Sequence, residues 1–419
     1  MAVRRPSYLA IAVISAIVLV SLYLVATRRD GTPIPSLGAG RVKALRPKLT
    51  DDIYNSTLGF EKIFVIGLPS RTDRRDGIVL EAALSNIDVE FIDGVQGKDV
   101  PDKAIPTGPG LERMPDPNVG SWRAHINAIQ EVVRRNLSSA LILEDDVDWD
   151  VRLRDQLYDF ALSAHALTQP LANSTSSNSA PQYADTTFPD PRAGLPSIPD
   201  LAFDSLPATL APTASPYGDQ WTVLWLGHCG MRFPFPPSYH NDNNERAVPK
   251  GRVVRAADPT VPQQQHLWTI SDPDDLKAQY ANHTRVTHHM QDGVCSLAYA
   301  VTRKGARQLL LELGLKPLAA PFDIELRWFC EGGGGDAPRG GGGAGRHTCL
   351  TTQPSLFGIH LPAGPRKSSS DITDHGDGFQ EKAVTRNVRY SVRMNADALM
   401  EGRRTDELVD QWPDANEVP

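Results

Sequence analysis

The sequence lacks an excess of positive charge: 43 lysines and arginines stand against 50 aspartates and glutamates, a net charge of -7 at pH 7. An acidic surface repels phosphate backbones, so we do not expect nucleic acid as a partner. A small anionic ligand in a local basic pocket is still compatible with this charge. The Gly-rich stretch 331–346 lacks the Gly-Lys-Ser/Thr of a phosphate-binding P-loop, so we assign it no nucleotide role. His288 and His289 have no ligand partner at i+4, which argues against zinc.

Cysteine is also scarce, and the four residues are Cys229, Cys295, Cys330 and Cys349. An even number allows three pairings, and we expect Cys330–Cys349, because these two bracket the Gly-rich stretch. Four free thiols in a reducing compartment are the alternative. N-x-[ST] sequons support a lumenal main part of the chain; they occur at Asn55, Asn136, Asn173 and Asn282.

One long hydrophobic run, Tyr8 to Ala26, carries no charge. As a helix it would be about 28 Å long, close to the hydrocarbon thickness of a bilayer. A cleaved signal peptide would have a shorter apolar core and an A-x-A-like exit, which is not visible here. We therefore predict a cytoplasmic tail (1–7), a transmembrane signal-anchor (8–26) and a stem (27–58). Basic residues flank the run on both sides, so the positive-inside rule alone does not decide the orientation.

Strand and helix patterns alternate along the rest of the chain, which predicts an α/β fold with a largely parallel sheet. Apolar runs predict strands over 62–68, 88–94, 140–143, 221–227 and 293–302. Apolar residues at helical spacing predict helices over 72–85, 120–136 and after Thr302. The Ser-, Thr-, Pro- and Ala-rich stretch 163–218 has no periodicity, and we expect it to be a disordered surface insertion.

The stretch "ALILEDDVDWD" sets a buried strand directly before Glu144, Asp145 and Asp146. If the strand continues, Glu144 and Asp146 share one face and Asp145 points to the other. Ligands of open α/β sheets bind at the carboxyl ends of strands. Hard carboxylate oxygens there suit Mg²⁺ or Mn²⁺, which can bridge to a diphosphate. We therefore predict a metal site that a bound nucleotide completes.

The same stretch resembles other acidic motifs. A calcium loop starting at Asp146 fails, because its sixth position is Val151 and its twelfth is Leu157. A phosphatase of the haloacid dehalogenase type matches Asp146 and Asp148 but not Asp150, where Thr or Val belongs. The charges can also simply open the next helix at its N-terminus.

Four blocks of the sequence together resemble glycosyltransferase family 25, which includes lipooligosaccharide and collagen galactosyltransferases. They are "IFVIGLPSRTDRR", "VGSWRAHINAIQEVV", "ALILEDDVDW" and "AYAVTRKGARQLL" with the following "PFDIEL". "SSSDI" near Asp371 is similar to the closing motif of the family. Ser121 and Ala124 replace the usual Cys and Ser of the second block. The resemblance covers residues 59–375, which we take as the transferase domain, followed by a C-terminal extension (376–419).

This resemblance implies a GT-A-like fold and transfer of a sugar from a UDP-sugar, with inversion and a divalent cation, Mn²⁺ or Mg²⁺. UDP-galactose is the first candidate donor, and a glycan or protein is the acceptor. With the anchor, it implies a single-pass type II protein of the Golgi or endoplasmic reticulum membrane with a lumenal catalytic domain. An inactive relative that binds glycans or proteins, and a metal-dependent phosphohydrolase, are the alternatives.

Roles for individual residues follow from the motifs. Asp146 and Glu144 are the predicted metal ligands, and Asp145 contacts ribose or orders the loop. The predicted phosphate- or base-binding residues are Arg71, Arg74 and Arg75, which otherwise are surface arginines at a helix start. The predicted catalytic residues are His125 and Asp323. His125 is a substrate contact or a buried core histidine. Asp323, preferred over Glu325, is the general base or a helix cap.

Overall fold

The computed structural model describes residues 48–174, 180–191, 199–235, 248–332, 347–372 and 376–414. The predicted tail, anchor and most of the stem lie outside these ranges, as do residues 333–346 of the Gly-rich stretch. Within the described ranges no helix has the length and apolar character that crossing a bilayer requires. Residues from Lys48 onward form one compact unit, to which all of the following applies.

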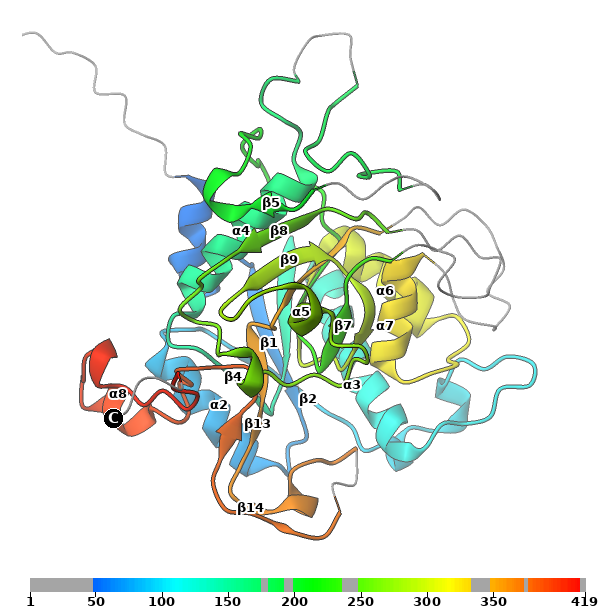
Figure 1. Ribbon diagram of the computed structural model, residues 1–419. Helices are drawn as coiled ribbons and strands as arrows, with labels where there is room; N and C mark the ends of the chain where they lie inside the picture. The colour runs from blue at the N-terminus through cyan, green and yellow to red at the C-terminus, as the bar shows by residue number, and fades with distance from the viewer. Residues whose placement is uncertain are drawn as a thin grey trace, which may run out of the picture. The chain divides into compact units, whose positions relative to one another are not determined.

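A nine-stranded sheet with the order β2-β1-β3-β11-β6-β12-β9-β8-β5 forms the centre of this unit (Figure 1). Its strands are β1 (Lys62–Gly67), β2 (Glu90–Asp93), β3 (Ser139–Glu144), β5 (Leu201–Ala202), β6 (Val223–Gly227), β8 (Arg252–Arg255), β9 (Arg285–His289), β11 (Ala298–Thr302) and β12 (Cys349–Gln353). Pairing is antiparallel on both sides of β11 and of β9 and parallel elsewhere. All the described strands of this sheet except β11 and β9 therefore run in one direction, so the predicted α/β fold with a mostly parallel sheet is confirmed.

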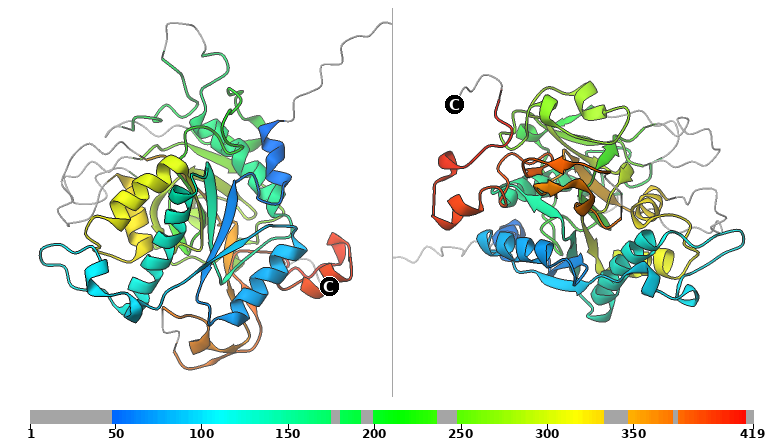
Figure 2. Two further views of the ribbon diagram at one scale, coloured as in Figure 1. Left: turned by 180° about the vertical axis from the view of Figure 1, so that it is seen from behind. Right: turned by 90° about the horizontal axis from the view of Figure 1, so that it is seen from below.

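Helices cover both faces of the sheet, because alternate residues of each central strand are apolar on opposite sides. The helices are α2 (Thr72–Leu84), α3 (Asp116–Arg134), α4 (Leu153–Thr168), α5 (Asp275–Gln279), α6 (Arg303–Gly314), α7 (Phe322–Glu331) and α8 (Ala396–Met400). Phe64 and Ile66 of β1 pack with α3, α6 and α7 in one core, and Figure 2 shows these helices side by side. Ile63 and Val65 pack with α2 and α4 in the core on the other face.

Short strands complete the unit: β4 (Val147–Trp149), β7 (Gly230–Arg232), β10 (Gln291–Val294), β13 (Phe357–Leu361), β14 (Gly364–Pro365), β15 (Phe379–Gln380) and β16 (Val384–Thr385). β13 lies between β4 and β16 in a small sheet. Residues expected to form a C-terminal extension belong to the same unit, since buried Asp148 accepts hydrogen bonds from Thr385 and Ser391, and α8 lies beside α2 (Figure 1).

Most predicted elements near the acidic stretch lie where the apolar patterns placed them. β1, β3 and α2 match within about two residues. α3 begins at Asp116 rather than at Gly120, because Pro117 is favourable in a first helical turn. The end of α4, residues 163–168, lies in the predicted insertion, because Ala164 and Leu167 pack in the core.

The expected disorder of the insertion does not hold where the structure describes it. After α4 ends at Thr168, Asp185 is fully buried and its carboxylate accepts the N–H of Gly251 at 2.9 Å. Tyr217 is also fully buried, and its hydroxyl donates to the carbonyl of Leu58. A low-periodicity sequence can be ordered by such single long-range contacts, which composition does not reveal.

Two disulfides join the four cysteines. Cys330–Cys349 is the pair predicted from the sequence, and it ties the end of α7 to the start of β12. Cys229–Cys295 is the other pair and joins the β6–β7 turn to the β10–β11 turn. The alternative of four free thiols is therefore wrong.

Candidate active site

A cleft of about 380 Å³ opens at the carboxyl ends of β1, β2 and β3. One face of α3 forms a wall, made by Asp116, Pro117, Gly120, Ser121, Ala124 and His125. The other residues that line the cleft include Gly67, Arg74, Lys98, Glu144, Asp145, Asp146, Asp371 and Ile372. This is the edge of an α/β sheet at which ligands are expected to bind.

The three acidic residues all reach this cleft, but not by strand alternation. β3 ends at Glu144, and Asp145 and Asp146 form the turn that leads into β4. Asp145 lies against β1, where its Oδ1 accepts a 2.7 Å hydrogen bond from Arg74. The strand does not continue past Glu144, so the condition under which Asp145 would point away from the other two is not met.

Gly67 at the end of β1 makes room for Asp145. A Cβ on Gly67 would lie 2.0 Å from Oδ2 of Asp145 and 2.8 Å from its Cβ. Any larger residue at position 67 would therefore push the acidic turn away from β1.

Asp146 is the least satisfied of the three carboxylates. Its Oδ1 is buried and has no hydrogen-bond partner among the described residues, and its Oδ2 lies 3.3 Å from Nη2 of Arg74. Burial raises the pKa of Asp146 to about 7, assisted by the charges of Glu144 and Asp145 and opposed by Arg74. A buried oxygen without a partner is costly, and Asp146 Oδ1 is therefore available to a ligand in the cleft.

Glu144 is held by two neighbours from different elements. Its Oε1 accepts a 2.8 Å hydrogen bond from Ser296 Oγ and lies 3.3 Å from His125 Nε2. Burial opposes ionisation, but the hydrogen bonds from His125 and Ser296 and the charge of Arg74 outweigh it and lower the pKa of Glu144. Glu144 is therefore an oriented, ionised carboxylate at the cleft.

His125 is packed more tightly than a direct substrate contact would require. It is 1% exposed, its ring stacks on Phe322 at 4.0 Å, and its Nδ1 lies 3.0 Å from the hydroxyl of Tyr299. Its Nε2 faces Ser296 and Glu144. This arrangement agrees with the buried-histidine interpretation and gives His125 a role in holding Glu144.

The three predicted arginines separate in the structure. Arg74 lines the cleft between Asp145 and Asp146 and also donates to the carbonyl of Ser369 at 2.7 Å. Arg71 pairs with Asp73 and Asp371 and lines a smaller adjoining cavity of about 110 Å³. Arg75 pairs with Asp93 and lies over the ring of Phe91. The structure therefore brings only Arg74 of the three to the main cleft.

The two candidate bases on α7 also differ. Asp323 lies outside the residues that line the cleft; its Oδ2 accepts the N–H of Cys295 at 2.8 Å and its Oδ1 accepts the N–H of Ile324 at 2.9 Å. Glu325 is fully buried, and its Oε1 accepts the N–H groups of Ala319 and Ala320. Glu325 is thus occupied in ordering the loop before α7 and, like Asp323, lies outside the residues that line the cleft.

The structure argues against the phosphatase alternative, because Asp148, the second aspartate of that motif, is not available to a substrate. Asp148 is fully buried, and its carboxylate accepts hydrogen bonds from Thr385, Ser391 and the N–H groups of Trp149 and Arg393. A carboxylate so surrounded cannot serve as an acid or base at a substrate.

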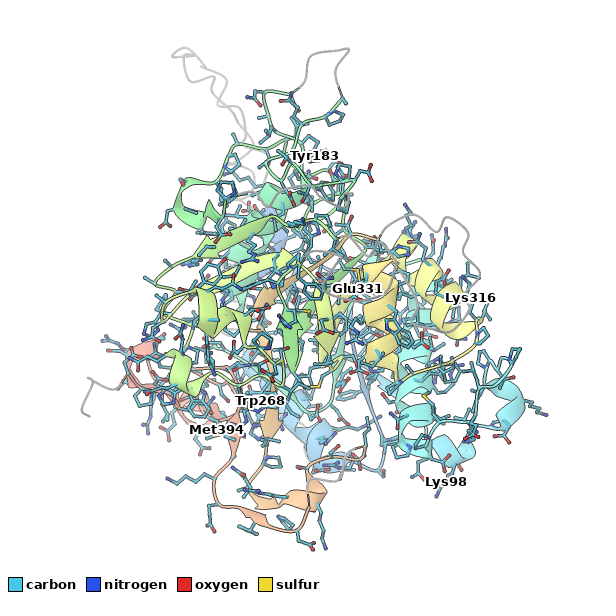
Figure 3. The ribbon with its side chains drawn as sticks, turned by 45° about the vertical axis from the view of Figure 1, so that its right-hand side comes forward. Lys98, Tyr183, Trp268, Lys316, Glu331 and Met394 are labelled. Carbon is cyan, nitrogen blue, oxygen red and sulfur yellow. A yellow bond between two sulfur atoms is a disulfide. The ribbon has the colours of Figure 1, made fainter. Side chains whose placement is uncertain are left out.

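Two site residues were missed by sequence reasoning. Lys98, labelled in Figure 3, lies on the 3₁₀ turn Gly97–Asp99, lines the cleft and forms no ion pair in the described part of the chain. Ser296 bonds Glu144 from the β10–β11 turn. Neither residue lies in a local sequence motif. The one signal for Lys98 is that it follows β2, because loops after parallel strands approach the edge of the sheet where ligands bind.

The raised pKa of Asp146 predicts how the thermal stability of the protein depends on pH, without any substrate. Because the pKa of Asp146 is raised above that of an unfolded aspartate, about 3.9, this carboxyl stabilises the fold fully only at low pH. That stabilisation is lost as the pH rises through about 7. Asp146→Asn cannot ionise, so at pH 8 with chelator it should melt a few degrees above the wild type, since about 1 kcal/mol shifts the melting temperature by roughly 2–4 °C. Thermal denaturation at pH 5 and pH 8 checks this.

The control is Asp148→Asn, two residues away, which loses acceptors for several buried donors and should lower the melting temperature at both pH values. A melting difference between Asp146→Asn and wild type that is the same at both pH values would contradict the prediction.

Comparison with known proteins agrees with the resemblance drawn from the motifs. The family model "Glycosyltransferase family 25 (LPS biosynthesis protein)" matches residues 60–187, which hold β1, β2, β3 and the acidic turn. The predicted resemblance to this glycosyltransferase family is thereby confirmed over that part of the chain.

Particular relatives match over similar lengths. Mouse procollagen galactosyltransferase 2 is 28% identical over 116 residues, 25% of this chain and 18% of the relative. A glycosyltransferase 25 family member of Anopheles gambiae is 29% identical over 133 residues, 29% and 22% of the two chains. Human inactive glycosyltransferase 25 family member 3 is 32% identical over 114 residues, 24% and 19%. The chain thus spans about a fifth of the length of the curated relatives it matches.

Proposed function

We propose that this protein is a glycosyltransferase that transfers a sugar from a nucleoside-diphosphate sugar to a hydroxyl of a glycan or protein. The observation that carries the proposal is the cleft at the carboxyl ends of β1–β3, with Asp146 Oδ1 buried and unpartnered beside it. The match to glycosyltransferase family 25 covers the same strands. UDP-galactose is the donor to test first, because relatives with this match are named galactosyltransferases.

The residues present fit a divalent cation that the nucleotide helps to hold. The described residues contain no cluster of three or more metal-ligating side chains. Mg²⁺ is usually bound in such sites by one or two carboxylates together with substrate phosphates and water, so a full protein cage is not required. Asp146 would hold the ion through its free oxygen, and Glu144 would stand beside it. When bound, Mn²⁺ or Mg²⁺ offsets the charge of the departing diphosphate.

The chain's own residues supply the other parts of the reaction. Lys98, which is positively charged, lines the cleft, where it would attract the diphosphate. Arg74 fixes Asp145 and Asp146 in place. Asp323, the base predicted from the motif, is proposed to accept the proton of the acceptor hydroxyl as that oxygen attacks the anomeric carbon from the side opposite the diphosphate. Because Asp323 lies outside the residues that line the cleft, the acceptor would approach from the side of the β10–β11 turn. Attack from that side inverts the configuration.

The cellular setting is proposed from the sequence. The run 8–26 would anchor the protein in the Golgi or endoplasmic reticulum membrane with the described unit in the lumen. Two disulfides suit an oxidising compartment.

An inactive, ligand-binding protein is the second candidate, and two observations favour it. One matched relative carries the name of an inactive family member. Ser121 and Ala124, which replace residues of the family motif, both line the cleft. Such a protein would bind the nucleotide or a glycan in this cleft without transfer.

The deciding experiment measures the melting temperature of the lumenal part against a panel of nucleotide sugars, with and without Mn²⁺. A ligand that binds only the folded state raises the melting temperature by mass action. We expect a rise with one donor and Mn²⁺, followed by nucleotide release on incubation. Binding without release would support the second candidate, and neither binding nor release would contradict both.

Lys98 provides a sharper test of donor binding. Lys98→Ala should raise the KM for the donor about 10-fold, near 1.4 kcal/mol, with a smaller change in kcat. The effect should shrink at high ionic strength, because an exposed charge is screened. Lys103→Ala, on the neighbouring 3₁₀ turn and outside the cleft, is the control. An unchanged KM in Lys98→Ala would remove Lys98 from the donor site.

A further inference from the structure

The turn between β10 and β11 contacts two carboxylates at once: Glu144, which lines the cleft, and Asp323, the proposed base. The N–H of Cys295 donates to Asp323 Oδ2 at 2.8 Å, and the next residue, Ser296, donates from Oγ to Glu144 Oε1 at 2.8 Å. Asp323 lies in the first turn of α7, whereas Glu144 ends β3. One two-residue segment therefore fixes side chains from two separate elements.

Cys295 itself is in a conformation that needs outside support. Its φ is +61°, in the left-handed region that a non-glycine residue adopts only at a cost. Its carbonyl accepts a 3.0 Å hydrogen bond from Trp225 Nε1, and its sulfur is bonded to Cys229. Strained backbone persists where the surroundings over-determine it, and such places are often functional.

The other end of the disulfide is equally well held. Cys229 donates its N–H to the carbonyl of Val294, and its own carbonyl accepts from Ile270. The disulfide thus clamps the β10–β11 turn to the β6–β7 turn on the side of the sheet where β3 ends. The second disulfide, Cys330–Cys349, lies at the opposite ends of the strands, since Cys349 pairs with Val223 at the start of β6.

We propose that the Cys229–Cys295 disulfide is a positioning element of the active site, which holds the Cys295–Ser296 turn so that Glu144 keeps its place at the cleft and Asp323 keeps its place beside the turn. The inference rests on the proposed transferase function and adds to it a covalent element of the site. Cys229, Cys295 and Ser296 act through the two carboxylates and need no contact with substrate.

The test compares two double variants of the whole lumenal part. Cys229→Ala/Cys295→Ala should lower kcat at least 10-fold while the KM for the donor stays within about threefold. Cys330→Ala/Cys349→Ala, the matched control, should lower the melting temperature but leave kcat near wild type. Amide hydrogen exchange should become faster at 143–146 and 294–297 in the first variant only.

Exchange separates failure of this inference from failure of the proposed function. If the wild type turns over no donor, the proposed function fails, while the exchange comparison still decides whether the disulfide orders the acidic turn. Unchanged kcat and exchange in Cys229→Ala/Cys295→Ala, or equal changes in both double variants, would overturn the positioning role.

Single variants cover the case in which the double variant does not fold. Ser296→Ala keeps the disulfide and removes only the hydroxyl that bonds Glu144, so kcat should fall at constant KM. Asp323→Ala removes the acceptor of the Cys295 N–H, and the 294–297 exchange should rise; Asp323→Asn, which retains an acceptor, should restore slow exchange. Wild-type kcat in Ser296→Ala together with wild-type exchange in Asp323→Ala would also overturn the inference.

Discussion

Replacing Asp146 by alanine is expected to lower kcat/KM for donor turnover at least 1,000-fold, about 4 kcal/mol of transition-state stabilisation. The reason is the oxygen that the fold leaves without a partner: Oδ1 is buried at the cleft, and the described residues offer it no donor. Removal of this oxygen would remove the proposed ligand of a cation that the departing diphosphate would share. The Mn²⁺-dependent part of nucleotide binding should be lost in the same variant, as measured by thermal shift or calorimetry.

Asp88→Ala is the control for this result, because Asp88 is an exposed carboxylate that precedes β2 and does not line the cleft. It should leave turnover, Mn²⁺ dependence and the melting temperature near wild type. If Asp146→Ala kept a tenth or more of the wild-type kcat/KM, the acidic turn would not be the catalytic centre, and the second candidate, a binding protein without transfer, would gain.

Replacing Gly67 by alanine should have the second largest effect. The new Cβ would overlap Oδ2 of Asp145 and lie too close to its Cβ. The Asp145 side chain must therefore move, and its carboxylate loses the hydrogen bond from Arg74. We expect donor affinity to fall about 10- to 100-fold and the free energy of unfolding to fall by about 1–3 kcal/mol. Donor titration and chemical denaturation measure the two effects.

The cause can be separated from a general packing defect. Gly314→Ala at the end of α6 would place its Cβ 3.1 Å from a Leu310 methyl and 3.6 and 3.7 Å from two Ile126 methyls, so it should be neutral or slightly stabilising. Asp145→Ala should reduce donor affinity as much as Gly67→Ala does, and the double variant should be no worse than either. Additive losses would show that Gly67 acts through something other than Asp145.

The parts of the fold that the sequence predicted are those with local patterns. Continuous apolar runs gave β1 and β3, and helical spacing gave α2 and most of α3. The position of β11 between β3 and β6 has no local signal, because strand order depends on which surfaces pack after the chain returns. Residues 199–218 were misjudged for the same reason: Tyr217 is ordered by its contact with Leu58, far away in the sequence.

The candidate site divides in the same way. Glu144, Asp145 and Asp146 were predictable because acidic residues directly follow a buried strand. The end of β3 at Glu144 was not, and it decides that all three side chains reach one cleft. The motifs drew attention to His125, which lines the cleft, and to Asp323, which does not; their contacts with Ser296, Glu144 and Cys295 depend on a turn from another part of the chain. Lys98 has no neighbours in sequence that would mark it.

The place of β11 has a consequence for how the polypeptide reaches this state. β3 is complete at Glu144, but the strand that pairs with its free side begins only at Ala298. During synthesis this edge of β3, a strand that is apolar on both faces, therefore stays unpaired until residues 298–302 have left the ribosome. Exposed edges of this kind invite association with other chains. A fragment restricted to the family-matched residues 60–187 should for that reason aggregate, and the full-length nascent chain should depend on chaperones until β11 inserts.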